Sequence, residues 1–284
     1  MLVGAHLRRL REECGISRAE AGYAIRSSES KISRIELGRV KLKHRDVADL
    51  LTLYGVTEGP EREALLSRVR EANTPSWWQP YGDVTPDWFT RYLGLEAMAT
   101  LIRTYEAQFV PGLLQTADYA RAVIRLGHPS ASEAEIDRRV QLRLERQLAV
   151  LHRPDPPKLW AVVDEAALRR PIGGKAVMRD QLMTLIEYTA KAPHVRLQVM
   201  PLAAGGHAAA GGSFTILRFG KQRPYLSDLV YIEQLTHALY LESRADVEVY
   251  FDTVNRLYVD AAPISRTAEI LEGILNELYP GKPR

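Results

Sequence analysis

Basic side chains are concentrated at the start of the chain. The first 46 residues hold eleven lysines and arginines but six aspartates and glutamates, a net charge of +5, whereas the remaining residues carry 27 basic and 29 acidic side chains. Lysine and arginine bind phosphate through charge-assisted hydrogen bonds, so this concentration is typical of a module that binds a polyanion. Charge alone leaves a second interpretation open, a solvated surface that happens to be basic.

Helical patterns surround these charges. Apolar residues at helical spacing predict five short helices, which end near Gly15, Ile25, Gly38, Gly55 and Glu71. Ser17 and Glu20 have the spacing of a capping box, in which the serine hydroxyl caps the start of a helix and the glutamate reaches back to it. Residues 1–72 are therefore expected to form an all-α domain.

Part of this domain resembles the helix-turn-helix of the phage repressor and Cro type, known as the XRE family. The resemblance covers about residues 2–56 and rests on the stretches Leu7-Arg8-Arg9-Leu10-Arg11, Gly15-Ile16-Ser17 and Lys31-Ile32-Ser33-Arg34-Ile35-Glu36-Leu37-Gly38-Arg39. It implies that the third helix enters the major groove of DNA, which is wide enough to admit an α-helix.

The expected DNA contacts follow from this placement. Ile32 and Ile35 face inward, which leaves an exposed face at the start of the third helix with Ser28, Glu29, Ser30, Lys31 and Arg34. Lys31 and Arg34 are the candidates for guanine edges or nearby phosphates, and the two serines can donate to either. Arg18, at the start of the second helix, is expected on a phosphate. The residues expected to contact the DNA backbone beyond the third helix are Arg39, Lys41 and Lys43.

Other positions in the domain are interpreted as structural. Glu36 matches a family position that forms an internal ion pair with an arginine of the first helix, here Arg11. Cys14 is the single cysteine, which excludes an internal disulfide, and it is expected to be a small core residue. Arg26 and Ser27 stand where the family often has a glycine and an apolar residue, so the family's base preference does not transfer directly.

The helical pattern breaks at residues 73–80, which contain two prolines and two tryptophans. We interpret this segment as a linker or as the first ordered segment of a second domain, since exposed indoles are unfavourable. Residues 81–284 are expected to form that domain, helical over 88–151 and α+β with a mixed sheet over 158–284. The candidate strands are Leu159–Val163, Val195–Met200, Ser213–Phe219, Leu229–Glu233 and Ala238–Leu241. The fold class is therefore α+β, with an all-α first domain.

Four arginines lie off the apolar stripe of the helix that ends near Leu151. They are interpreted as a solvated face, with a second surface for nucleic acid or a partner as the alternative. These residues are Arg138, Arg139, Arg143 and Arg146.

The second domain resembles the uncharacterised C-terminal domain of actinobacterial regulators with this helix-turn-helix, among them WhiJ-like and antitoxin-like repressors. The stretches that carry the resemblance include Trp77-Trp78, Tyr92-Leu93-Gly94-Leu95-Glu96-Ala97, Val110-Pro111-Gly112-Leu113-Leu114-Gln115-Thr116, Arg143-Leu144-Glu145-Arg146-Gln147 and Gly212-Ser213-Phe214-Thr215-Ile216-Leu217. It implies a transcriptional regulator whose larger domain binds something, and a small partner protein encoded nearby.

Few residues of the second domain have the types and spacing of a catalytic or metal site. Its histidines lack metal-ligand spacing, and Asp164-Glu165 is interpreted as a helix cap or surface pair, so we expect no metal, no cofactor and no enzymatic activity. The glycine-rich segment 203–212 is interpreted as a mobile hairpin loop, with a lid as the alternative. The segment 111–120 could line an effector or partner groove, or could be a core-packed helix start. The candidate groove residues are Trp77, Trp78, Phe109, Gln115 and Tyr119.

The leading hypothesis is a cytoplasmic, sequence-specific DNA-binding transcriptional regulator, a repressor, that acts as a homodimer on a pseudo-palindromic operator. Its second domain would bind a small-molecule effector or a small protein partner. The alternative is an antitoxin-like interaction protein that mainly sequesters such a partner. The chain shows no apolar run long enough to span a bilayer and no signal-peptide pattern at its start, so no membrane partner is expected.

Overall fold

The structure is a computed structural model that describes residues 2–38, 40, 42–72, 76–220 and 226–279. The chain forms two compact units, Met1–Ser76 and Trp77–Arg284. Of the expected linker, residues 73–75 lie outside the described residues, whereas residues 77–80 belong to the second unit.

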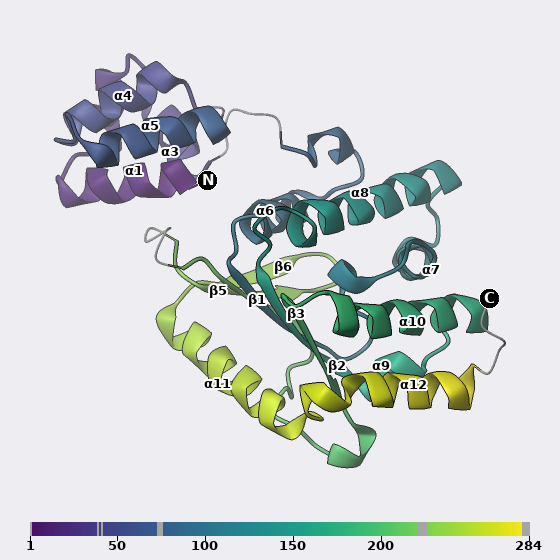
Figure 1. Ribbon diagram of the computed structural model, residues 1–284. Coiled ribbons are helices and arrows are strands. Elements are labelled where there is room, and N and C mark those ends of the chain that lie inside the picture. The colour runs from purple at the N-terminus through teal and green to yellow at the C-terminus, as the bar shows by residue number, and fades with distance from the viewer. Residues whose placement is uncertain (1, 39, 41, 73–75, 221–225, 280–284) are drawn as a thin grey trace. The chain divides into compact units, whose positions relative to one another are not determined.

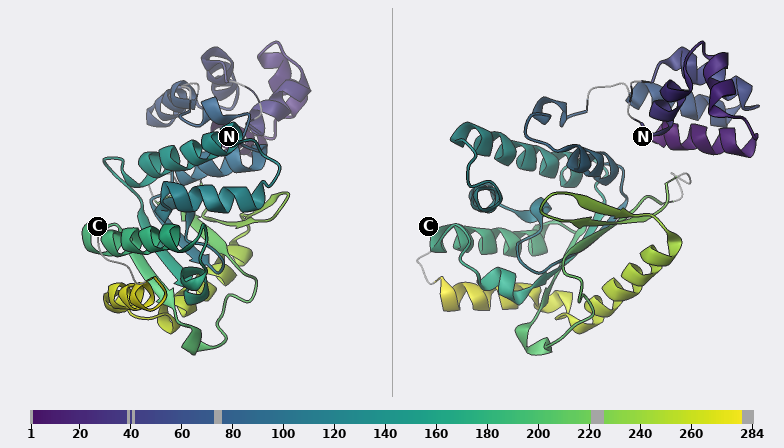
Figure 2. Two further views of the ribbon diagram at one scale, coloured as in Figure 1. Left: turned by 90° about the vertical axis from the view of Figure 1, so that its right-hand side faces the viewer. Right: turned by 180° about the vertical axis from the view of Figure 1, so that it is seen from behind.

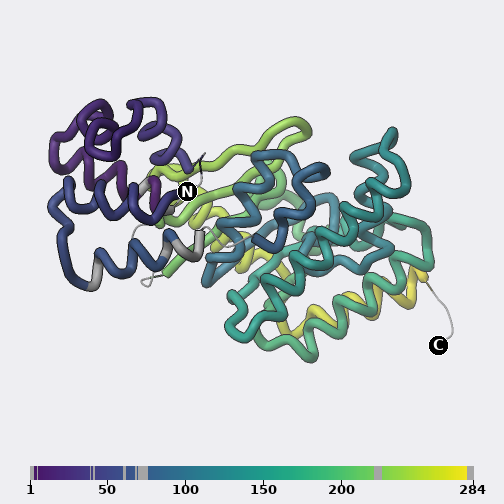
Figure 3. The backbone as a smooth tube through the Cα atoms, turned by 90° about the horizontal axis from the view of Figure 1, so that it is seen from above, coloured from purple at the N-terminus to yellow at the C-terminus, as the bar shows by residue number. Residues whose placement is uncertain are grey.

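The first unit is a bundle of short helices, as Figure 3 shows in its purple and blue trace. The all-α prediction for this part of the chain is confirmed. The helices are α1 (Leu2–Glu13), α2 (Arg18–Ala24), α3 (Glu29–Glu36), α4 (His44–Leu53) and α5 (Pro60–Ala72). The capping box at the start of α2 is present, with the Ser17 hydroxyl accepting from the Glu20 N–H and the Glu20 carboxylate accepting from the Ser17 N–H.

The helices of the first unit pack around one apolar core. Leu7 of α1, Ile32 and Ile35 of α3, and Val47 and Leu51 of α4 are almost completely buried in it. Glycine permits two close approaches of the backbone. A Cβ atom at Gly4 would lie 2.2 Å from the Ile35 carbonyl oxygen, and one at Gly22 would lie 2.9 Å from the Ser27 carbonyl oxygen. These contacts bring α1 and α2 against the two ends of α3.

The turn between α2 and α3 contains Arg26 in the left-handed region, with φ at +52°. The Ser27 N–H donates to the Gly22 carbonyl at 2.8 Å and the Arg26 N–H donates to the Tyr23 carbonyl at 3.0 Å, which is the hydrogen-bond pattern of a Schellman motif. Glycine is the usual residue at this position of the motif. Arg26 therefore carries a steric strain that a glycine at this position would not have.

The second unit is built on a mixed sheet with helices on both faces. Its described part contains six strands in the order β3-β2-β1-β4-β5-β6, with β1, β2 and β3 parallel and the others antiparallel. The strands are β1 (Leu101–Glu106), β2 (Lys158–Asp164), β3 (Val195–Met200), β4 (Phe214–Arg218), β5 (Leu229–Glu233) and β6 (Ala238–Leu241). The expected α+β fold class with a mixed sheet is confirmed.

The expectation that residues 88–151 are helical was wrong at β1, which lies in the middle of the sheet between β2 and β4. Both faces of β1 are covered, so Ile102 and Thr104 are buried on one side and Tyr105 on the other. A strand buried on both faces loses the apolar–polar alternation that marks a half-exposed strand. The six residues of β1 therefore lack the sequence pattern of a strand. Because helical patterns lie on both sides of them, the sequence suggests that the helical region continues through them.

Helices cover the two faces of the sheet unequally. One face packs on α11 (Arg244–Asp260), and the other on α6 (Asp87–Glu96), α8 (Glu133–Leu151), α10 (Lys175–Lys191) and α12 (Thr267–Leu278) (Figures 1 and 2). The shorter elements are η1 (Gln79–Tyr81), η2 (Gly112–Leu114), α7 (Ala117–Gly127), α9 (Glu165–Arg169), η3 (Leu202–Ala204) and η4 (Ile264–Arg266). Each face has its own apolar core, with Leu159 and Leu182 in one, and Val162 and Val254 in the other.

The substitution Arg26→Gly is expected to stabilise the first unit by about 0.5–1 kcal/mol. A residue with a Cβ atom is strained in the left-handed region, and glycine removes this strain. We expect this gain to outweigh the loss of stability that arises because glycine makes the unfolded chain more flexible. Urea denaturation followed by the helical circular dichroism signal measures the change. Ala24→Gly, at the last residue of α2, is the matched control and should destabilise by up to about 1 kcal/mol. Equal losses in both variants would contradict the assignment of strain to Arg26.

Candidate nucleic-acid interface

The exposed face of α3 begins at its N-terminal end. Glu29, Ser30 and Arg34 are exposed, while Ile32 and Ile35 are buried on the opposite side. Ser28 is also exposed, but its hydroxyl caps the helix by accepting from the Lys31 N–H at 3.3 Å. Arg34 lies along the helix, its Nε donating to the Ser30 carbonyl at 3.4 Å. These side chains lie on the exposed side of α3, from its first turn to its last, the geometry that reading a DNA groove requires.

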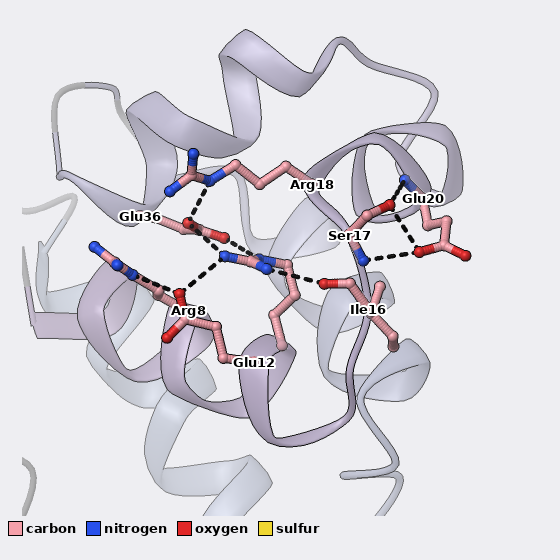
Figure 4. A network of polar contacts seen from close by, with 8 residues as sticks. Arg8, Glu12, Ile16, Ser17, Arg18, Glu20 and Glu36 are labelled. Atoms are coloured by element: carbon pink, nitrogen blue, oxygen red, sulfur yellow. Dashed lines mark hydrogen bonds and ion pairs between the residues drawn. The ribbon is translucent and has the colours of Figure 1, made fainter.

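A buried carboxylate, that of Glu36, holds the end of α3 against α1 and α2 (Figure 4). Arg11 donates through Nε to Glu36 Oε1 at 2.6 Å and through Nη2 to Oε2 at 3.2 Å. Its remaining Nη1 donates to the Ile16 carbonyl at 2.9 Å. The hydrogen bond to Glu36 raises the pKa of Arg11, although burial acts the other way. The pair has the bidentate geometry that makes arginine–carboxylate contacts strong.

Arg18 binds the same carboxylate, so its side chain has a fixed partner within the protein. Its Nε donates to Glu36 Oε2 at 3.2 Å, and its side chain is 37% exposed. Arg18 is the first residue of α2, so its guanidinium lies at a positive helix end beside α3. A phosphate at this place would meet a guanidinium whose position is already fixed.

Lys31 is held by an acidic side chain that the sequence analysis did not single out. Its Nζ lies 2.7 Å from Oδ2 of Asp46, in the first turn of α4, and its side chain is 27% exposed. Without DNA, Lys31 is thus held between α3 and α4, and its contact with a base or phosphate stays a prediction. The separation of fifteen residues gave no local pattern from which to predict the pair.

The other expected contacts differ in how far the structure describes them. Lys43 is exposed and occupies the N-cap position of α4. Arg39 and Lys41 lie outside the described residues. Cys14 is exposed, with Sγ donating to the Tyr54 carbonyl at 3.4 Å, so the expectation of a core cysteine was wrong. It lies just beyond α1, whose core-facing positions are taken by Leu7 and Leu10.

In the second unit, the arginines of α8 do not share one environment: the side chain of Arg138 is 40% exposed, whereas the other three are half-buried or buried. Arg146 is buried and makes a bidentate pair with Glu96 at 2.6 and 2.7 Å, and Arg143 donates to Gln115 Oε1 at 2.7 Å. Arg138 pairs with Asp83, and Arg139 with Glu135. The solvated interpretation is corrected for Arg143 and Arg146, whose partners Gln115 and Glu96 lie outside α8 and cannot be recognised from the sequence of α8 alone.

The candidate effector residues are used in packing and in supporting the backbone. Gln115 is buried and donates to the Val110 carbonyl at 2.7 Å, while the Tyr119 hydroxyl accepts from the Val110 N–H at 3.1 Å. Trp77 and Trp78 make an edge-to-face contact in a separate cluster. Phe109 is half-buried. The tryptophans thus lie in a different part of the unit's core from Gln115 and Tyr119.

Two further features of the second unit bear on the interpretation of its sequence. Asp164 caps α9 by accepting from the Ala166 N–H at 2.8 Å, which matches the helix-cap interpretation. The glycine-rich segment 203–212 is docked through His207, whose Nε2 lies 2.9 Å from the Tyr105 hydroxyl and 3.7 Å from Asp164 Oδ2. Ala209 of the same segment is buried in the core beneath α11. The hairpin interpretation was wrong, because β3 and β4, the strands on either side of this segment, are not neighbours in the sheet. The mobility of the segment stays a prediction.

Glu106, at the end of β1, has an unusual environment. Burial raises its pKa from the ordinary 4.5 to about 7, although a hydrogen bond with Ser213 acts in the opposite direction. Burial and the neighbouring Arg146 lower the pKa of Arg143 to about 10. Both side chains therefore lie where an isolated charge is unfavourable.

Comparisons with known proteins divide the chain at the same place as its fold. Residues 2–65 match a family described as a helix-turn-helix domain, and residues 89–273 match a family described as a domain of unknown function, DUF5753. Searches of the curated proteins and of the solved structures found no significant match. Over the described residues, no helix has the length and apolar character needed to cross a membrane. The match of the first unit identifies it as a DNA-binding element.

Removing the buried carboxylate tests its structural role. Glu36→Leu is expected to destabilise the first unit by about 3–5 kcal/mol, because the buried Arg11 guanidinium loses its partner. The double variant Arg11→Met/Glu36→Leu should recover most of this loss, since no unpaired charge remains in the interior. Urea denaturation followed by circular dichroism measures both. A double variant that is as unstable as the single one would contradict this explanation.

The pKa of Glu106 predicts a pH dependence of stability. Its folded pKa lies above the unfolded value, so the folded state binds this proton more tightly, and the resulting stability is lost as the pH rises from about 4.5 to about 7. Glu106→Gln should be more stable than the natural protein by about 1–3 kcal/mol above pH 7 and should differ little at pH 4.5. Thermal unfolding across this range measures the difference, and the exposed Glu187→Gln variant is the control.

Proposed function

This chain belongs to the DUF5753 family, and because a helix-turn-helix domain precedes that family's domain, we propose that it is a sequence-specific transcriptional regulator. The observation that supports this proposal most directly is the exposed face of α3. Glu29, Ser30 and Arg34 project from it, and the neighbouring Lys31 forms an ion pair with Asp46. The unit that contains this helix also carries the chain's excess of basic residues. On this basis we call α3 the recognition helix.

The finer assignments belong to the same proposal. The motifs around the recognition helix favour the phage repressor and Cro type, and those of the second unit favour the actinobacterial, WhiJ-like regulators. We propose a cytoplasmic homodimer that represses transcription from a pseudo-palindromic operator, with half-sites about one helical turn apart. The second unit would bind an effector or a small protein partner rather than catalyse a reaction.

Two groups of residues have different roles in this proposal. Lys31 and Arg34 stand on the recognition helix and would contact base edges, so Lys31→Ala and Arg34→Ala should lower the discrimination between operator and unrelated DNA. Arg18 and Lys43 flank that helix and would contact phosphates. Arg18→Ala and Lys43→Ala should weaken binding to all sequences and should reduce the slope of log affinity against log salt by about 1.

The operator is first selected from genomic fragments with the native protein, and binding is then titrated at several salt concentrations. Arg125→Ala serves as the matched control, because this exposed arginine of α7 belongs to the second unit. Unchanged operator binding by all four variants would refute the assignment. A small protein that co-purifies in equal amounts while no DNA fragment is enriched would instead favour the antitoxin-like alternative.

Asp46 provides a separate test of the recognition helix. Asp46→Asn removes the anion that holds Lys31, so the lysine gains freedom and the domain gains one unit of positive charge. The expected result is tighter binding to unrelated DNA with a smaller operator preference, because non-specific affinity is electrostatic. The ratio of the two dissociation constants, measured at a fixed salt concentration, checks this outcome. An unchanged ratio would show that the Lys31–Asp46 contact has no part in recognition.

A further inference from the structure

The sheet face that packs on α11 carries basic side chains at one end of its strands. The register places Arg196 of β3, Trp160 of β2 and Arg103 of β1 side by side in one row. The next row holds Lys158 of β2 and Arg218 of β4, which both pair with the same residue of β1. Side chains two residues apart on a strand share a face, so both rows project from one side of the sheet. We call these four side chains the basic patch: Arg103, Lys158, Arg196 and Arg218.

Aromatic rings hold two of the arginines of the basic patch in place. Tyr258 of α11 stacks on Trp160, with ring centroids 3.8 Å apart and ring planes at 11°. Cζ of Arg196 lies 5.2 Å from the centroid of the Trp160 ring, and Cζ of Arg103 lies 5.6 Å from that of Tyr258. The Trp160 ring is itself fixed, because its Nε1 donates to Gln198 Oε1 at 2.7 Å. The guanidinium groups are therefore positioned by cation–π contacts, which leave their positive charge in place.

Most of the positive charge of the basic patch has no acidic partner. Asp228 pairs with Arg218 at 2.8 Å, and among the described residues it is the sole carboxylate within ion-pair distance of the patch. Nη1 of Arg103 donates to the neutral Asn255 Oδ1 at 3.1 Å, and the remaining two basic side chains are exposed. Four positive charges thus face a single carboxylate.

This lack of acidic partners differs from other surface positions of the second unit. Arg125 pairs there with Glu133, and Arg138 with Asp83. Beyond residue 46 the chain has slightly more acidic than basic side chains, so its composition does not explain an unpaired cluster. Because neighbouring like charges repel each other, a cluster of this kind is complementary to a polyanion.

We propose that the basic patch binds backbone phosphates of the duplex DNA that flanks the operator. Arginine and lysine bind phosphate through charge-assisted hydrogen bonds, and DNA presents phosphates in regular rows. The aromatic rings do not form an open platform for single-stranded bases, because Tyr258 covers one face of Trp160. The inference rests on the DNA-binding function proposed above, and it adds a second contact with the same partner, made by the second unit.

The test compares two duplexes, each titrated with the full chain at several salt concentrations. One is the minimal operator, and the other has about 15 base pairs of unrelated sequence on each side, or about 50 Å of additional duplex at each end. We expect the longer duplex to bind at least about tenfold more tightly and with a steeper salt dependence, because each added phosphate contact releases counterions. A different sequence in the flanks should give the same result, since phosphate contacts carry no sequence information.

Variants locate the contact. Arg196→Gln and Lys158→Gln, at exposed positions, should each weaken binding to the longer duplex about three- to tenfold at about 0.1 M salt and reduce the salt slope by about 1. Binding to the minimal operator should not change. Arg103→Lys keeps the charge and should retain the salt slope that Arg103→Gln reduces.

Matched controls remove exposed positive charges from helices that cover the opposite face of the sheet. Lys175→Gln in α10 and Arg125→Gln in α7 should bind both duplexes as the natural protein does. The unfolding temperature of each variant reports whether it folds, and the ratio of affinities for operator and unrelated DNA of equal length should be the same in all of them. This ratio separates the patch from the recognition helix, whose variants are expected to lower it.

Four outcomes would overturn the proposal. If the natural protein binds the operator but binds the longer duplex no more tightly, the second unit makes no contact with DNA, while the regulatory function stands. If the longer duplex is preferred equally by patch and control variants, the contact lies elsewhere. If a patch variant leaves DNA binding unchanged but releases a co-purifying acidic protein, the patch is a protein interface. If the natural protein enriches no DNA fragment, the proposed function fails together with this inference.

Discussion

The carboxylate of Glu36 is the interaction on which the position of the recognition helix depends. It lies at the end of α3 and accepts hydrogen bonds from Arg11 of α1 and Arg18 of α2, so a single side chain links three helices. Such a buried charge is favourable only when its partners are in place. The net contribution of this contact to stability is small, but removing one partner is strongly destabilising, and this keeps α3 in place. The position of α3 in turn determines which of its side chains are exposed.

The second unit depends on a different constraint, the need to satisfy buried polar groups around an irregular segment. Residues 107–116 cross the covered face of the sheet with little regular structure, so their backbone groups need partners from elsewhere. Gln115, Gln147 and Gln181 supply many of them, through the carbonyls of Val110, Gly112 and Leu114 among others. The same region contains Arg146, Arg143 and Glu106. The side chains that support the fold thus lie beside a small cavity that Glu106 and Arg146 help to line.

The two units differ in how their charged side chains are distributed and paired. The excess of positive charge lies in the first unit, and part of it is internally neutralised, since Arg11 and Lys31 have acidic partners there. The side chains left for DNA are fewer than the charge count suggests, and Arg34 and Lys43 are the exposed ones among the described candidates. In the second unit, positive and negative side chains form many surface pairs, and Arg146 and Glu96 form a pair inside the core.

The sequence by itself determined the local structure of the first unit, because helix caps, glycine stops and apolar spacing act within a few residues. It also located five of the six described strands, since each is a short apolar run bounded by turns. The tertiary structure alone decided the position of β1, the burial of Arg146, and the pairing of Lys31 with Asp46. In each case the deciding partner lies far away along the chain. Burial and charge pairing depend on that partner, so they cannot be predicted from the residues that are near in the sequence.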